Sequence, residues 1–220
     1  MYPPIKKQFG CISFDKGGYY CIREKDTFSF IRCGRHKDRP AHADNLHLDI
    51  WYQGENCLFD GGSYKYNTTE KLLRYFMGTE SHNTIMLEGH DQMLKGDRFI
   101  WYNWSQAEWS SLKETEDTYI FEGKVSCFTY LNKEIKHSRK IVKWKNTCKW
   151  EIEDCIDGNP KNMNMRQLWH TNKDNLSLES NGETVDTEQL CSNYYGQTTK
   201  CRQIEFQTKN SSIKTILQFI

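Results

Sequence analysis

Residues 42–66, HADNLHLDIWYQGENCLFDGGSYKY, decide the fold of this chain. From Asn45 onward apolar and polar residues alternate, and this period of two places one set of side chains on a core-facing surface: Leu46, Leu48 and Ile50. A turn at residues 53–56 and the apolar run 57–59 predict a return strand. The Gly61-Gly62 pair ends that strand, because glycine tolerates backbone conformations that other residues avoid. The stretch therefore predicts an antiparallel hairpin.

Short strands separated by turns fill most of the remaining sequence. Residues 11–33 carry aromatic and β-branched runs on either side of Lys16-Gly17-Gly18, which is typical of a meander. Further strand candidates are 98–104, 107–112, 118–128, 137–145, 148–156, 165–170, 175–179, 202–207 and 213–219, with a strong turn at 157–160. Strand spacing near ten residues favours a sandwich over βαβ units. We therefore predict an all-β fold, an antiparallel, supersandwich-like β-sandwich that forms a single domain over residues 1–220.

One short helix interrupts the strands. The sequence Asn67-Thr68-Thr69-Glu70 matches a capping box, with Asn67 as the N-cap and Glu70 three residues later. Four apolar residues then share one helical face: Leu72, Leu73, Phe76 and Met77. Gly78 ends the helix, and residues 82–87 resume a strand.

Composition excludes several classes of protein. Thirty basic and 29 acidic residues give a net charge of +1 without a basic block, so nucleic acid is not an expected partner. The aromatic fraction of 14% supports a packed core, although only 37% of residues are hydrophobic, and it suits a surface that binds carbohydrate. The N-terminus has no apolar signal-peptide core, and no 18-residue apolar run is present. We expect neither a signal peptide nor a membrane span in this chain.

Nine cysteines are scattered through the sequence without a CxxC pair. This spacing argues against a cysteine zinc site. We interpret most of them as buried, small apolar residues in a reducing environment, and a partial set of disulfides stays open.

Histidines and carboxylates around the hairpin are ligand types that zinc uses, and candidates for such a site are His42, His47, Asp60 and His82. A simple hairpin sets Asp60 near Leu48 and Asp49, which favours His47 over His42 as its neighbour. His42 reaches Asp60 only if residues 40–44 fold back over the hairpin. Asp44 is available to orient an imidazole. The alternative is that these are ordinary surface or core histidines.

Aromatic residues near the hairpin offer a second kind of chemistry. Tyr64 and Tyr66 share one strand face, where they either pack in the core or act as proton donors or acceptors on a polysaccharide. Trp101, Trp104 and Trp109 suit either a sugar-binding platform or the core.

A longer series of residues resembles the C-terminal β-sandwich of the heparinase II/III-like polysaccharide lyases. The matching residues are His42-Ala43-Asp44, Leu46, Leu48, Gly54, Asp60-Gly61-Gly62, Tyr64, Tyr66, His82-Asn83-Thr84, 88–93 and 98–101. The match is clearest over residues 10–110. Arg39-Pro40 before the HAD motif is similar to a branch of the family with the pattern RPxHAD.

This resemblance implies a site and an activity. It implies one zinc ion, held by His42, Asp60 and His82 and usually structural, with Asp44 and Asn83 orienting the ligands. It further implies β-elimination on an acidic, uronic-acid-containing polysaccharide, for which Tyr64 and Tyr66 are our catalytic candidates and Arg39 and Trp101 our substrate-binding candidates. Family members are typically periplasmic or secreted bacterial proteins.

Two departures from the family pattern bear on activity. The family's helical toroid, which carries other catalytic residues, is absent from these 220 residues, so the expected partner is such a toroid in the same or a separate chain. Pro40 stands where a catalytic histidine is common. The alternative function is therefore a carbohydrate-binding or interaction sandwich that keeps zinc as a staple without catalysis.

Overall fold

The first five strands form one antiparallel sheet in a computed structural model that describes residues 8–159 and 163–220. They are β1 (Gly10–Phe14), β2 (Tyr19–Arg23), β3 (Thr27–Arg32), β4 (Leu48–Tyr52) and β5 (Glu55–Leu58), and they pair in sequence order. The predicted turn is a tight loop with positive φ at Gln53 (51°) and Gly54 (84°), the backbone of a type I′ turn. The hairpin predicted from the opening stretch is confirmed.

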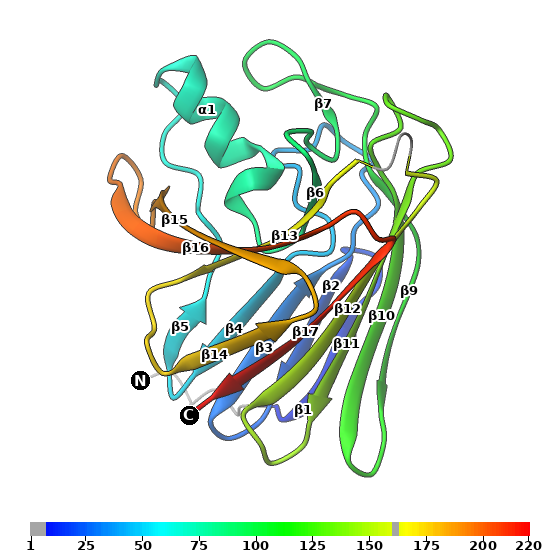
Figure 1. The fold of residues 1–220 in the computed structure, drawn as a ribbon, viewed down its shortest axis with the longest axis vertical. Helices are drawn as coiled ribbons and strands as arrows, with labels where there is room; N and C mark the ends of the chain where they lie inside the picture. The colour runs from blue at the N-terminus through cyan, green and yellow to red at the C-terminus, as the bar shows by residue number, and fades with distance from the viewer. Residues whose placement is uncertain (1–7, 160–162) are drawn as a thin grey trace, which may run out of the picture.

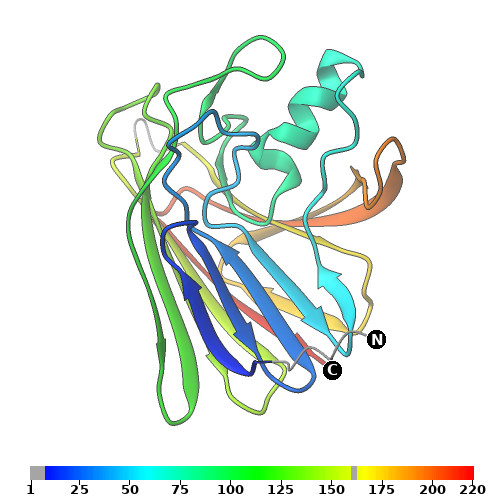
Figure 2. The same cartoon turned by 180° about the vertical axis from the view of Figure 1, so that it is seen from behind.

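A six-stranded sheet packs against the first, as seen from both sides in Figures 1 and 2. Its order is β14 (Leu176–Ser180), β17 (Ser212–Phe219), β12 (Lys149–Asp157), β11 (Lys136–Trp144), β10 (Thr118–Ser126) and β9 (Gln106–Glu114). Side chains of both sheets form one core that includes Leu48, Ile50, Phe121 and Trp150. Burying each such side chain contributes about 1.5–3 kcal/mol, which explains why the period-two pattern fixes the faces of these strands.

A third sheet crosses one end of this sandwich. It comprises β15 (Glu183–Cys191), β16 (Thr199–Thr208), β13 (Met165–Thr171) and β6 (Ile85–Leu87), and a short ribbon of β7 (Leu94–Lys95) and β8 (Trp101–Tyr102) lies near it. The helix α1 (Glu70–Met77) and a 3₁₀ turn, η1 (Thr79–Ser81), lie beside this sheet in Figure 1. The all-β, antiparallel sandwich with one short α-helix is therefore confirmed.

Some local predictions were wrong. The helix is capped by Thr69, whose hydroxyl accepts a hydrogen bond from the Leu72 amide, rather than by Asn67. Residues 98–104 contain only the two-residue β8, because Arg98 and Asn103 have positive φ and end the extended run. Strand β15 was missed because its mixed polar sequence does not alternate clearly. The turn predicted at 157–160 ends in Pro160, which lies outside the described residues.

Within the described residues, no helix is long and apolar enough to cross a bilayer. The nine cysteines are free thiols, five of them buried.

Candidate metal centre

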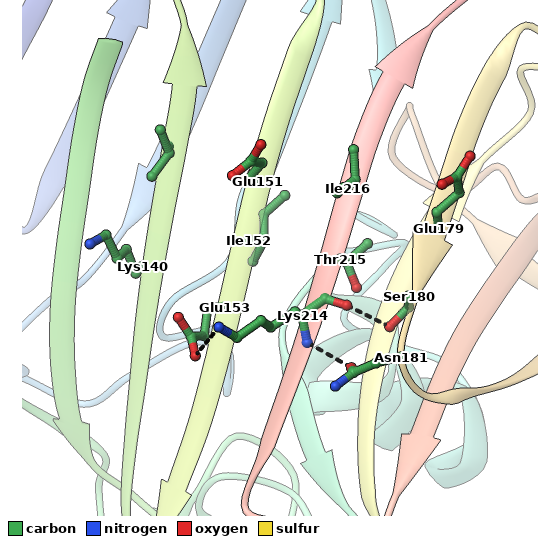
Figure 3. Close-up of a pocket in the computed structure, with 11 residues that line it drawn as sticks. Lys140, Glu151, Ile152, Glu153, Glu179, Ser180, Asn181, Lys214, Thr215 and Ile216 are labelled. Carbon is green, nitrogen blue, oxygen red and sulfur yellow. Dashed lines mark hydrogen bonds and ion pairs between the residues drawn. The ribbon is translucent and has the colours of Figure 1, made fainter.

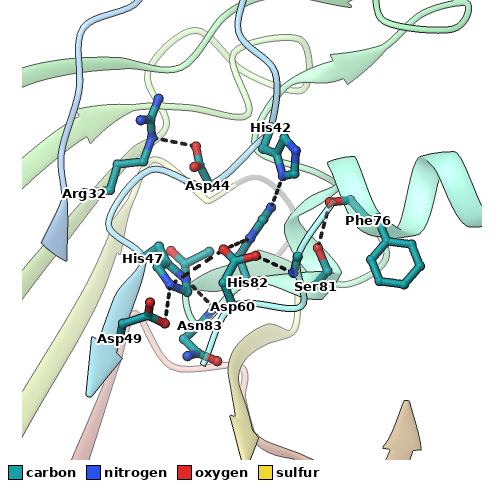
Figure 4. Close-up of polar contacts among 12 residues, drawn as sticks. Arg32, His42, Asp44, His47, Asp49, Asp60, Phe76, Ser81, His82 and Asn83 are labelled. Atoms are coloured by element: carbon teal, nitrogen blue, oxygen red, sulfur yellow. Dashed lines mark hydrogen bonds and ion pairs between the residues drawn. The ribbon is translucent and has the colours of Figure 1, made fainter. Parts of the chain in front are cut away.

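Three loop segments bring His42, Asp60 and His82 together at the end of the sandwich (Figure 4). Asp60 lies two residues after the end of β5, and His82 directly follows η1. His42 precedes β4 on a segment that folds back, because the Ala43 amide donates to the Met77 carbonyl and the Ala43 carbonyl accepts from the Thr79 hydroxyl. These backbone contacts hold the segment before β4 over the hairpin, which brings His42 to Asp60 and His82.

His82 lies at the middle of this cluster. Its Nδ1 is 2.7 Å from Asp60 Oδ2, and its Nε2 is 3.2 Å from Nδ1 of His42. The other oxygen of Asp60 accepts a hydrogen bond from the Gly62 amide at 2.6 Å, and Nε2 of His42 is 3.3 Å from the Ser63 hydroxyl. A continuous polar chain therefore runs from the carboxylate through two imidazoles to the surface.

His47 also lies near Asp60, as hairpin geometry predicted, with Nε2 3.7 Å from Oδ2. His47, Asp60 and His82 each offer a ligand atom within 4.8 Å of the others. However, Nδ1 of His47 accepts a hydrogen bond from the Asn83 amide at 2.9 Å, so in the neutral ring Nε2 carries the proton and donates to Asp49 at 3.0 Å. His47 therefore has no free lone pair for a metal in this arrangement.

The charges of the cluster are strongly coupled. Burial favours neutral Asp60, but the imidazole of His82 outweighs burial and holds the pKa of Asp60 below its usual range. Burial likewise opposes protonation of His82, yet Asp60 raises its pKa. Burial and the neighbouring His82 lower the pKa of His42. The cluster thus combines an ionised carboxylate with an imidazole, His42, that favours its neutral, ligating form.

Two of the three expected ligands, His42 and His82, are arranged as a zinc site would need. Two imidazole nitrogens, Nε2 of His82 and Nδ1 of His42, face each other at 3.2 Å. Two nitrogens bound to one tetrahedral zinc at their usual bond lengths would lie about 3.3 Å apart. Asp60, on the opposite nitrogen of His82, has the position of a carboxylate that orients a ligating imidazole.

Asp44 and Asn83 hold the surroundings of the cluster in place. Asp44 forms an ion pair with Nε of Arg32 at 2.7 Å, and its charge partly offsets the lowering of the pKa of His42 by burial and His82. The side-chain amide of Asn83 donates to the carbonyls of Leu48 and Phe59. Its oxygen accepts from the backbone and ring of His170. Asn83 thus joins β4, the residue after β5, and β13 through a fully satisfied amide.

The four remaining site candidates lie in different environments. The prediction that Tyr64 and Tyr66 share one strand face was wrong, because neither lies in a strand. Tyr66 is 68% exposed, whereas Tyr64, with φ of 55°, packs its ring on Phe76 at 5.5 Å. Arg39 is exposed, and its guanidinium lies 5.8 Å from the ring of Phe99. Trp101 is buried, with its indole N–H donating to the Ala41 carbonyl, so its ring supports the backbone beside His42 and presents no face to a sugar.

Sequence reasoning missed an aromatic cluster that surrounds Tyr66. The ring of Tyr66 lies 5.7 Å from Phe99 and 5.9 Å from Tyr195, and Tyr195 is itself 68% exposed. A hollow of about 640 Å³ adjoins these residues between the start of α1 and the β7–β8 loop, and Arg39 and Arg98 contribute to its lining. No sequence pattern links residues 39, 66, 99 and 195, because only the crossing of distant loops brings them together.

A second hollow lies on the outer face of the six-stranded sheet (Figure 3) and has a volume of about 610 Å³. Lys214 pairs there with Glu153 at 3.2 Å, and Lys140 and Glu151 pair with neighbours outside the hollow. Asn181 and Ser180 are hydrogen-bonded to the backbone of Lys214. Within the described part of the chain, the lining of this hollow contains no histidine and no aromatic residue, unlike the end of the sandwich that carries His42, His82 and Tyr66.

Comparison with known proteins agrees with this architecture. A family model described as heparinase II/III-like, C-terminal, matches residues 7–216. The structure is similar to that of a heparinase III, the BT4657 gene product, with a TM-score of 0.79, 17% identity and coverage of 97% of this chain and 36% of that protein. It is also similar to the heparan sulfate lyase HepC from Pedobacter heparinus, with a TM-score of 0.78, 15% identity and coverage of 96% and 36%. No curated protein sequence matches the chain.

These matches define a class, the sandwich domain of polysaccharide lyases. The chain belongs to the heparinase II/III-like C-terminal family. It spans about 36% of the length of the two lyase structures.

Proposed function

We propose that this domain forms one wall of the catalytic cleft of a lyase that cleaves uronic-acid-containing polysaccharide by β-elimination. The observation that carries this proposal is an Asp60–His82–His42 cluster whose His42 contacts Ser63, three residues before the exposed Tyr66, and lies three residues after Arg39. Family membership supports the reaction class. A helical domain, in the same chain or a separate one, would supply the opposite wall.

The metal in this proposal is zinc, held by His42 and His82 with Asp60 as third ligand or as the group that orients His82. Bound there, the ion would act as a structural cross-link with positive charge. The three segments it would join are the loop before β4, the end of β5 and the residues after η1. Without the ion, a single contact between imidazoles joins His42 to His82. The ion would therefore fix the loops that carry Arg39 and Ser63.

The substrate in this proposal is an anionic sugar chain that lies over Tyr66, Phe99 and Tyr195. Aromatic rings stack on the apolar faces of sugars, and the rings of Tyr66 and Tyr195 are exposed. Arg39 provides a bidentate donor for a carboxylate or sulfate and makes no ion pair within residues 8–159 and 163–220. This combination selects charged polysaccharides over neutral ones.

The reaction needs three tasks from the assembled site. The uronate carboxylate must be neutralised, the C5 proton removed, and the departing 4-oxygen protonated, so that a C4–C5 double bond forms and the glycosidic bond breaks. In this proposal Arg39 performs the first task, and Tyr66, which is exposed, performs a proton-transfer step. Tyr64, packed on Phe76, is the positioning residue of the pair.

The test is an assay of the unsaturated product. The chain, alone and together with its helical domain, is incubated with heparan sulfate, chondroitin sulfate, hyaluronate and alginate, and ultraviolet absorbance of the unsaturated uronate is followed. We expect product from the assembled protein, reduced at least tenfold by Tyr66→Phe. Product from none of these polymers with the assembled protein would overturn the lyase proposal.

A second candidate function is carbohydrate binding without cleavage. Pro40 favours it, because a proline ring cannot transfer protons and stands close to His42 in sequence. Under this alternative the assembled protein binds an anionic polysaccharide, and Arg39→Ala weakens that binding, while no unsaturated product forms.

A further inference from the structure

Two thiols meet inside the β15–β16 hairpin. Cys191 and Cys201 are 1% and 3% exposed, and with Phe59 they form a small buried cluster separate from the main core. In the strand register Cys191 faces Thr199, and Cys201 lies two residues further along β16. Since side chains on a strand alternate, both thiols lie on the same face of the hairpin as diagonal neighbours.

The two sulfur atoms interact with each other. They share one small buried cluster, and the closeness of Cys201 lowers the pKa of the Cys191 thiol to about 6, while the pKa of Cys201 is raised in return. The Thr199 hydroxyl lies 3.2 Å from the sulfur of Cys191 and completes its surroundings. By contrast, burial raises the pKa of Cys127 and of Cys33, which lie among many apolar side chains of the main core. The hairpin pair therefore differs chemically from the other buried cysteines.

We propose that Cys191 and Cys201 are a dithiol site that forms a disulfide by exchange with a disulfide donor, either a small molecule such as oxidised glutathione or a protein. When the end of β15 opens and exposes the buried Cys191 sulfur, its thiolate attacks one sulfur of the donor, forms a mixed disulfide and releases one donor thiolate. Cys201, after losing its proton, attacks the Cys191 sulfur and releases the second. The pair loses two electrons and two protons, and the donor is reduced to two thiols.

The position of Cys191 allows the bond to close. A diagonal pair in a regular ladder is slightly too far apart for a disulfide. Cys191, however, is the last residue of β15, where the ladder ends and the backbone turns into the 192–198 loop. A small adjustment at this strand end closes the gap without disturbing the rest of the sheet.

The bond would lock a loop that reaches the candidate metal centre. Within that loop the Ser192 amide donates to the Gly61 carbonyl, one residue after Asp60. The Gly196 amide donates to the Tyr64 carbonyl, and the Tyr195 hydroxyl accepts a hydrogen bond from the Tyr66 amide at 3.4 Å. A closed ring of residues 191–201 would therefore restrain both the tyrosine surface and the strand end that carries Asp60.

The experiment compares free thiols before and after oxidation of the wild-type protein. The protein is treated with oxidised glutathione, denatured, alkylated with N-ethylmaleimide and mapped by mass spectrometry. We expect two fewer alkylated thiols than the nine of the sequence, one cross-linked peptide pair joining Cys191 to Cys201, and full reversal by dithiothreitol. Thermal unfolding of the oxidised form should shift upward by about 5 °C, because the bond restricts the unfolded chain.

Matched variants separate this pair from the others. Cys191→Ser and Cys201→Ser should each abolish the cross-link and the thermal shift, whereas Cys127→Ser should retain both. Alkylation of all nine thiols after oxidation, or a cross-link that joins either cysteine to a different partner, would overturn the proposal. Because the wild-type map alone gives this result, poor folding of a variant does not prevent a decision, and the outcome is independent of lyase activity.

Discussion

Two carboxylate–imidazole pairs in this molecule have the same N···O distance but differ in how accessible they are to a ligand. Asp154 contacts His137 on the six-stranded sheet, and Asp60 contacts His82 at the end of the sandwich, each at 2.7 Å. Asp154 also accepts from Nε and Nη2 of Arg139 and from Gln167, and its side chain is fully buried. Its hydrogen-bonding capacity is used up, so it has none left for a ligand.

The Asp60 pair remains open. The side chain of Asp60 is 34% exposed, and the second nitrogen of His82 faces another imidazole instead of a strong donor. A carboxylate beside a histidine therefore does not by itself define a site. A site is defined by solvent access and by a lone pair that no hydrogen bond occupies.

The buried Asp154–His137 pair with its donor Arg139, here the closed pair, supports the Asp60–His82 pair, here the open pair. Nη1 of Arg139 donates to the carbonyls of Leu46 and Asn83, which flank His47 and His82 in sequence. The buried guanidinium thus connects the six-stranded sheet to the loops that carry the candidate centre.

The largest effect should come from breaking the closed pair. Arg139→Met removes the guanidinium that pairs with buried Asp154, leaves the Leu46 carbonyl without its donor, and leaves the Asn83 carbonyl with the Leu48 amide alone. We expect the free energy of unfolding to fall by about 3–5 kcal/mol, measured by urea denaturation. Lys214→Met, which removes an exposed partner of Glu153, is the control and should cost less than about 1 kcal/mol. If Arg139→Met lowers the free energy of unfolding by less than about 1 kcal/mol, the hydrogen bonds of Arg139 to Asp154 and to the two carbonyls are not needed for stability.

The second-largest effect should come from acid, which protonates Asp154 and removes its contribution to stability. Burial disfavours ionised Asp154, but Arg139 and His137 outweigh burial and hold its pKa well below the usual range. A depressed folded-state pKa stabilises the protein above the unfolded-state value of about 4 and loses that contribution as pH falls below it. Urea midpoints of metal-free protein should therefore decrease from about pH 5 downward. Asp60→Asn should keep most of this decrease; a flat profile in that variant would assign the effect to the open pair.

Metal content sharpens the contrast between the pairs. Native protein should contain about one zinc per chain by elemental analysis, and His42→Ala or His82→Ala should lose it. His47→Ala should retain it, because the lone pair of His47 is occupied by the Asn83 amide. Asp60→Asn should weaken affinity by about 10–100-fold if Asp60 orients His82, and more if it is a ligand. Zinc retained by His82→Ala would refute the assignment.

The smallest effect concerns the exposed surface beside the open pair. Tyr195→Ala should weaken binding of an anionic oligosaccharide by about five- to tenfold, because one exposed ring is removed from the platform. Trp109→Ala, a comparably exposed aromatic residue on β9, is the control and should leave affinity unchanged in calorimetric titration. Equal effects of both substitutions would argue against a localised binding surface.

Sequence reasoning succeeded where the physics is local. Alternation along residues 46–50 predicted the buried face of β4, and the Gln53-Gly54 turn predicted the hairpin. The same hairpin arithmetic correctly placed His47 close to Asp60. It could not anticipate that a hydrogen bond from Asn83 would occupy the ring of His47, since that amide comes from a segment 36 residues away.

By itself, the sequence determined the sandwich fold and the family, because the period of two and the short motifs act over a few neighbouring residues. Only the tertiary structure decided which histidines face one another, how Arg139 saturates Asp154, and which tyrosines gather around Arg39. These contacts join residues far apart in the chain, and their energies depend on burial and on competing hydrogen bonds that exist only after the sheets have packed.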